Sequence, residues 1–243
     1  MALLEINGLN KHFGGIQAVS DCTFSVDEGR IVSLIGPNGA GKTTVFNLVT
    51  GLLSPDSGEM KFQGKRINGL EPHTITRLGI SRTFQITRDL QELTVLENMV
   101  IQSQVNGFFD MFGSSMLKHE TEHAMELLDF VGISHLAGEK SKNLSYGQKK
   151  LMEFASVLMS DPKLIMLDEP AGGVNPTLLE SIIDRILDLN KKGITFLIVE
   201  HNMDLVMKIS DPVICMAYGT VLAEGCPKDI QNNSQVMEAY LGE

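Results

Sequence analysis

The apolar residues of this chain form two patterns. Short, nearly continuous apolar runs at 31–35, 164–167 and 194–199 are typical of strands buried on both faces of a parallel sheet. Residues 177–190 instead show helical spacing, which predicts a core-facing helix. Its apolar positions are Leu179, Ile182, Ile183, Ile186 and Leu187. Strands of this kind alternating with helices predict an α/β fold.

Weaker patterns predict the remaining elements. Short strands are expected at 3–7, 22–26, 59–64, 79–84, 213–217 and 221–224. A helix that opens with proline is expected over 72–78. From about residue 86 to 160 the periodicity becomes helical, with Met125, Leu128 and Val131 on one face. This change predicts a helical subdomain inserted into the sheet.

The segment after the first buried run carries the strongest chemical signal. It consists of Gly36, Pro37, Asn38, Gly39, Ala40, Gly41, Lys42, Thr43 and Thr44. The spacing fits the phosphate-binding pattern G-x-x-x-x-G-K-[ST]. Glycines let backbone N–H groups face phosphate oxygens, Lys42 supplies charge for the β- and γ-phosphates, and Thr43 offers a hydroxyl to Mg²⁺. The alternative is a glycine-rich hairpin beside an exposed lysine, which the strand before and the helix after disfavour.

Two carboxylates follow the second buried run. Asp168 and Glu169 fall at its carboxyl end, where ligands bind in open α/β sheets. Asp168 is expected to hold the hydrated Mg²⁺, and Glu169 to act as general base on the water that attacks the γ-phosphate. The alternative, two solvated turn residues, explains less once a phosphate loop lies upstream.

Four further residues have both a functional and an ordinary interpretation. Phe13, in a glycine-containing loop, is expected to stack on a nucleotide base or else to pack in the core. Gln85 can offer a neutral oxygen to Mg²⁺ or be an unremarkable polar residue. His201 ends the third buried run and can donate to the γ-phosphate or serve structurally. Ser145 is a good N-cap for a helix whose first turn can bind an anion.

Composition narrows the class of protein. The formal charge of −10 and the lack of a basic run give no electrostatic indication of nucleic acid. Cys22, Cys215 and Cys226 have no metal-binding spacing, and no apolar run approaches the ~18 residues of a membrane span. The chain is therefore expected to be a globular protein that stays in the cytosol.

The order of these motifs resembles the nucleotide-binding subunit of ATP-binding cassette (ABC) transporters over essentially the whole chain. The most specific mark is the stretch Leu144-Ser145-Tyr146-Gly147-Gln148, called the signature below, which lies between the phosphate loop and the acidic strand. The resemblance implies one ABC ATPase domain over 1–243. It would comprise a RecA-like P-loop NTPase core with a mostly parallel sheet, an N-terminal antiparallel β subdomain and an α-helical signature subdomain at about 86–160.

The same resemblance implies roles for individual residues. ATP and Mg²⁺ are the expected cofactors, and two subunits would sandwich two ATP molecules. Ser145 and Gly147, with Gln148, would then bind the γ-phosphate held by the opposite protomer. Phe13 matches the adenine-stacking aromatic, Gln85 the loop that reports nucleotide state to the membrane domains, and His201 the switch histidine.

Two positions depart from the commonest family pattern, and others indicate a subfamily. Tyr146 stands where a second glycine is usual, and Asn175 where aspartate is usual. Tyr146, with the stretches 81–85, 93–98 and 236–242, is similar to the larger ATPase subunit of branched-chain amino acid importers. Urea and amide importers share this pattern, and lipopolysaccharide-export ATPases share it to a lesser degree.

The resemblance also implies partners. These are transmembrane permease subunits, a second copy or a related ATPase, and a solute-binding protein, with the chain peripheral at the cytoplasmic face of the inner membrane. The aromatic stretch 108–112 is expected either to contact the permease or to fold back on its own subdomain. Two rival functions are a soluble ABC ATPase acting on DNA or ribosomes and a P-loop kinase of small molecules.

Overall fold

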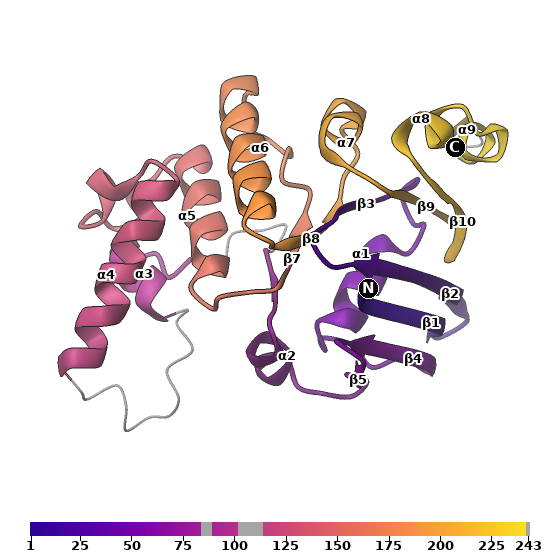
Figure 1. The fold of residues 1–243 in the computed structure, drawn as a ribbon, viewed down its shortest axis with the longest axis horizontal. Helices are drawn as coiled ribbons and strands as arrows, with labels where there is room; N and C mark the ends of the chain where they lie inside the picture. The colour runs from indigo at the N-terminus through magenta and orange to yellow at the C-terminus, as the bar shows by residue number, and fades with distance from the viewer. Residues whose placement is uncertain (84–88, 102–113, 242–243) are drawn as a thin grey trace.

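The computed structural model describes residues 1–83, 89–101 and 114–241, with no side-chain description for 114–117 and 241. The aromatic stretch 108–112 lies outside the described residues. Two sheets and several groups of helices make up the described chain (Figure 1). The predicted α/β class is confirmed.

A six-stranded, mostly parallel sheet forms the centre. Its order is β10 (Thr220–Gly225), β9 (Val213–Ala217), β3 (Ile31–Ile35), β8 (Thr195–Val199), β7 (Leu164–Asp168) and β6 (Ile80–Arg82). Only β10 runs antiparallel to its neighbour. All residues of β3, β7, β8 and β9 are buried, as the continuous apolar runs predict.

The second sheet is antiparallel and lies at the N-terminal end. Its order is β2 (Ile16–Asp27), β1 (Ala2–Phe13), β4 (Ser57–Phe62) and β5 (Lys65–Arg66). The predicted strands 3–7 and 22–26 are too short. Gly8 and Asp21, which border the predicted ranges, have φ of +57° and +46°, but irregular pairing lets both strands continue past them.

Two hydrophobic clusters cover opposite faces of the parallel sheet. Alternate residues of one strand face opposite sides, so Leu164 and Met166 belong to one cluster, and Ile165 and Leu167 to the other. The first cluster holds α1 (Lys42–Val49) between the two sheets. Phe46 in this helix is fully buried.

The second cluster joins the sheet to the helices that follow. It includes residues of α3 (Val95–Ile101), α4 (Ser114–Phe130), α5 (Tyr146–Leu158), α6 (Pro176–Lys191) and α7 (Met203–Ile209). In Figure 1, α3, α4 and α5 form a group at the end of the molecule opposite α8 (Pro227–Gln231) and α9 (Ser234–Leu241). The helical periodicity predicted between residues 86 and 160 is confirmed in its described parts; its independence as a subdomain stays a prediction. Helix α2 (Pro72–Leu78) has the predicted bounds.

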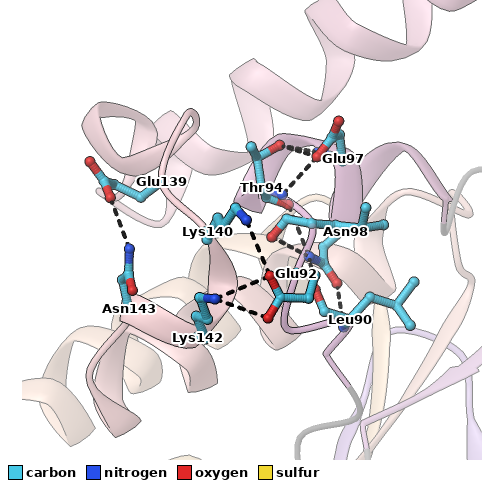
Figure 2. A network of polar contacts seen from close by, with 10 residues as sticks. Leu90, Glu92, Thr94, Glu97, Asn98, Glu139, Lys140, Lys142 and Asn143 are labelled. Carbon is cyan, nitrogen blue, oxygen red and sulfur yellow. Dashed lines mark hydrogen bonds and ion pairs between the residues drawn. The ribbon is translucent and has the colours of Figure 1, made fainter.

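A polar network fixes the segment that leads into α3 (Figure 2). The Glu92 carboxylate accepts hydrogen bonds from Lys140 and Lys142, which lie just before α5. The Asn98 amide donates to the carbonyl oxygens of Leu90 and Thr94. The Glu92 bonds hold the segment before α3 against the segment that leads into the signature, and the Asn98 bonds hold it against α3 itself.

We expect Gly58→Ala to destabilise the protein more than Gly64→Ala. Both glycines have positive φ, +94° and +73°, so alanine at either costs about 1–2 kcal/mol of backbone strain. A Cβ at Gly58 would also lie 2.4 Å from the Gly8 carbonyl oxygen, whereas nothing lies within 4 Å at Gly64. Denaturant unfolding of the two variants measures the difference, and equal midpoints would contradict the role given to this close approach.

Candidate functional site

The phosphate loop passes very close to two neighbouring strands. A Cβ at Gly36 would lie 2.0 Å from the Met216 carbonyl oxygen in β9, and one at Gly41 would lie 2.5 Å from that of Ala18 in β2. Their φ angles are +147° and +99°. Glycine is therefore required at both positions for space as well as for conformation.

The Lys42 side chain lies inside this loop. It is 6% exposed, and its ammonium donates to the carbonyl oxygens of Gly36 and Pro37 at 2.7 and 2.8 Å. Lys42 also begins α1, whose first-turn N–H groups favour an anion. The loop thus gathers a cation and a helix N-terminus where the sequence predicted phosphate binding.

A cleft of about 380 Å³ opens beside the loop. This size is within the range of about 300–1,000 Å³ that small-molecule sites occupy. The lining of the cleft consists of Phe13, Ala18, Asn38, Gly39, Ala40, Gly41, Lys42, Thr43, Thr44, Glu169 and His201. Residues predicted to bind the nucleotide therefore line the same cleft as two residues predicted to be catalytic, Glu169 and His201.

Phe13 lines the cleft, but it belongs to a different element than predicted. It is the last residue of β1 rather than part of a loop, and it is 45% exposed. The Lys11 ammonium lies 5.7 Å from its ring centroid. Hydrogen bonds from the Lys11 side chain and the His12 backbone lower the pKa of Asp56 to about 2. These contacts tie the end of β1 to the turn before β4.

Asp168 is buried in an ion pair that the sequence analysis did not foresee. Its Oδ2 accepts a hydrogen bond from Arg82 Nη2 at 2.7 Å, and the two side chains are 2% and 6% exposed. Arg82 also donates to Asn47 Oδ1 at 2.7 Å and lies 5.2 Å from the Phe46 ring centroid. Arg82 therefore connects the acidic strand to α1, the helix of the phosphate loop.

Glu169 and His201 lie beside each other in the lining of the cleft. His201 Nε2 lies 3.3 Å from Glu169 Oε1, with both side chains partly exposed. Glu169 has a φ of +51°, an uncommon value for a residue other than glycine. Its backbone N–H donates to the Val199 carbonyl of β8 at 2.9 Å. Such strain in a residue that lines a cleft is consistent with a functional position.

The signature residues lie away from this cleft. Ser145 caps α5: its Oγ accepts from Gln148 N at 3.3 Å, and Gln148 Oε1 accepts from Ser145 N at 2.8 Å. A Cβ at Gly147 would meet Leu178 at 2.7 Å. The N-cap prediction is confirmed, but the structure does not bring these three residues to the phosphate loop of their own chain.

The structure describes two of the three residues predicted to bind Mg²⁺. Thr43 lines the cleft, Asp168 lies buried at the carboxyl end of β7, and Gln85 lies outside the described residues. A hydroxyl and a carboxylate are oxygen ligands of the kind that Mg²⁺ prefers. The donor set therefore fits the metal. Among the described residues, no helix has the length and apolarity needed to cross a membrane.

Two stretches of the chain match known protein families. Residues 19–172 match the family described as "ABC transporter". The chain belongs to this family. Residues 220–243 also match a family described as "Branched-chain amino acid ATP-binding cassette transporter". As the resemblance implied, the protein is an ATPase of the ABC type.

Relatives are similar to this ABC ATPase over their full length. A probable branched-chain amino acid transport ATP-binding protein, LivG, from Archaeoglobus fulgidus is 44% identical, with 100% of this chain and 96% of the relative covered. The high-affinity branched-chain amino acid transport ATP-binding protein BraF from Pseudomonas aeruginosa is 39% identical, with 99% and 98% covered.

Solved structures of ABC cassettes share the fold. A nucleotide-free ATP-binding cassette from an ABC transporter has a TM-score of 0.90 at 38% identity and full coverage of both chains. A dimeric ABC cassette in a post-hydrolysis state with ADP and phosphate has a TM-score of 0.81 at 25% identity, covering 92% of this chain and 98% of that one. These likenesses confirm the predicted ABC cassette fold.

We expect Arg82→Ala to destabilise this ABC ATPase by about 3–5 kcal/mol, because it leaves the Asp168 charge buried without its partner. Urea unfolding without nucleotide measures the loss, and adding Asp168→Asn should restore part of it. As control, Arg30→Ala breaks an ion pair with Asp211 whose side chains are 56% and 65% exposed, and should cost less than about 1 kcal/mol. Equal losses in the two single variants would contradict a structural role for the buried pair.

Proposed function

We propose that this chain binds and hydrolyses ATP with Mg²⁺ to energise the import of branched-chain amino acids. The observation that carries the proposal is that residues of the phosphate loop line the same cleft as Glu169 and His201. The family supplies the class of reaction, and the cleft supplies the residues for its steps.

The phosphate loop and Lys42 bind the β- and γ-phosphates, and Phe13 stacks on the adenine. Thr43 and Asp168 would hold Mg²⁺, joined by Gln85, and the metal would neutralise charge on the phosphates. Glu169 takes a proton from the attacking water as general base. His201, 3.3 Å from Glu169, orients this carboxylate and can donate to the γ-phosphate.

The signature supports a dimer. Ser145, Gly147 and Gln148 lie away from the cleft of their own chain and present the N-terminus of α5. We propose that they bind the γ-phosphate held by a second ATPase protomer, either another copy or a related subunit. The existence of a dimeric ABC cassette with a similar fold supports this arrangement.

The names of the relatives support a proposal for the substrate and the other partners. These names refer to branched-chain amino acid transport, and residues 220–243 match a family with the same description. We accordingly propose permease subunits in the membrane, a solute-binding protein outside it, and a peripheral position for this chain at the cytoplasmic face of the inner membrane. The aromatic stretch 108–112 stays a candidate contact with the permease.

We expect Glu169→Gln to lower kcat for ATP hydrolysis by about 100-fold or more, since a general base contributes about 10²–10⁴-fold. The affinity for ATP should change less than about threefold, because the amide keeps the shape of the side chain. Phosphate release and binding of a fluorescent ATP analogue measure the two quantities. Glu180→Gln, at a carboxylate 60% exposed on α6, is the matched control and should leave both unchanged. An undiminished rate in Glu169→Gln would exclude the general-base role.

We expect tagged Glu169→Gln protein with Mg-ATP to retain permease subunits from detergent-solubilised native membranes. Because hydrolysis is blocked, the ATP-bound assembly should persist long enough to isolate. Lys42→Ala, which removes the phosphate-binding ammonium, is the control and should retain less. Two permeases, with or without a second ATPase, would support the importer. Leucine-dependent ATPase activity of the same subunits assembled with the unsubstituted chain, whose hydrolysis is intact, would test the substrate. Ribosomal or DNA-associated proteins alone would overturn the transport function.

A further inference from the structure

Residues 171–175, which follow Glu169 and precede α6, contact two distant parts of the chain. We call them the connecting loop. On one side Tyr146 Oη, at the start of α5, donates to the Gly172 carbonyl oxygen at 3.1 Å. The Tyr146 ring also packs against the loop, because a Cβ at Gly173 would lie 3.0 Å from it. The signature helix is thus in direct contact with the loop.

On the other side the loop is held by Glu200, which lies between β8 and His201. Its side chain is buried, with the residue only 2% exposed. One carboxylate oxygen accepts from Ala171 N at 2.7 Å, and the other accepts from His201 N at 2.8 Å and Asn202 N at 2.9 Å. A carboxylate accepting several backbone N–H bonds in a buried position forms strong, directional contacts. Glu200 therefore joins the connecting loop to the backbone of His201.

These two attachments converge on the hydrolytic pair. Gly172, the acceptor for Tyr146, donates its own N–H to the Glu169 carbonyl at 3.0 Å. Glu200 fixes the backbone of His201, whose Nε2 lies 3.3 Å from Glu169 Oε1. A continuous series of contacts therefore leads from the signature helix through the connecting loop to Glu169 and His201 in the same chain.

We propose that Tyr146 and Glu200 are positioning residues that hold the connecting loop from two sides and thereby set the geometry of Glu169 against His201. The proposal rests on the proposed function, in which Glu169 is the general base. Neither residue lines the cleft, so each acts through the loop rather than on ATP. Asn175 takes no direct part, because its side chain caps α6 by accepting from Leu178 N at 2.9 Å.

Two substitutions test the proposal with little change in shape. Tyr146→Phe removes only the hydroxyl of a residue that is 49% exposed, so the fold should be retained. Glu200→Gln places an N–H donor where an oxygen now accepts, and therefore opposes Ala171 N or the pair His201 N and Asn202 N. Each variant should lower kcat about three- to tenfold or more, while the affinity for ATP stays within about twofold. Tyr218→Phe, at a tyrosine 82% exposed, and Glu180→Gln are the matched controls.

The decisive measurement is a double-mutant cycle with Glu169→Gln. If Tyr146 and Glu200 act through Glu169, each substitution should have little further effect on the residual rate once the general base is removed. The same three- to tenfold loss in both backgrounds would overturn the proposal, as would an equal effect on ATP affinity and kcat. An unchanged rate in Glu169→Gln alone would instead overturn the proposed function, so the two failures are distinguishable.

Discussion

The cleft depends on the register of three parallel strands. Leu34 of β3 and Asp168 of β7 both pair with Val199 of β8, so the three strands end at the same level. Since parallel strands present their carboxyl ends at one edge, the segments that follow them meet there. The phosphate loop, Glu169 and His201 are those segments. A shift of one residue in β7 would reverse its side chains and separate Asp168 from Arg82, its buried partner on β6.

Much of this arrangement could be predicted from local patterns. The buried strands, the phosphate loop and the carboxylates at the end of β7 each have a signal within a few neighbouring residues. The structure brings the loop, Glu169 and His201 to one cleft. The N-cap at Ser145 was equally local, because the capping residue and its partner Gln148 are three positions apart. Such features depend on residues that are close in the sequence and hardly on the rest of the fold.

Other features required the tertiary structure. Arg82 is hydrogen-bonded to Asp168 although 86 positions separate them in the sequence. Glu200 is hydrogen-bonded to Ala171, which lies 29 positions before it. A single arginine or glutamate carries no sequence signal for a partner that only strand pairing brings near. The extension of β1 to Phe13 was missed for a related reason: cross-strand bonds maintain the strand through Gly8, which locally favours a turn.

The connecting loop is in contact with one of the two departures from the family pattern, Tyr146, and contains the other, Asn175. Glycine at position 146 could not reach Gly172, whereas tyrosine supplies both a hydroxyl and a ring for the loop. Asn175 caps α6 through its side-chain oxygen, a contact that aspartate could also make, so its lack of charge does not weaken this end of the loop. Chains of packed side chains and hydrogen bonds are one means by which energetic coupling is carried between distant sites. Tyr146, the connecting loop and Glu200 form such a chain of contacts within one subunit. It leads from the helix proposed to bind the partner's nucleotide to the pair proposed to hydrolyse its own.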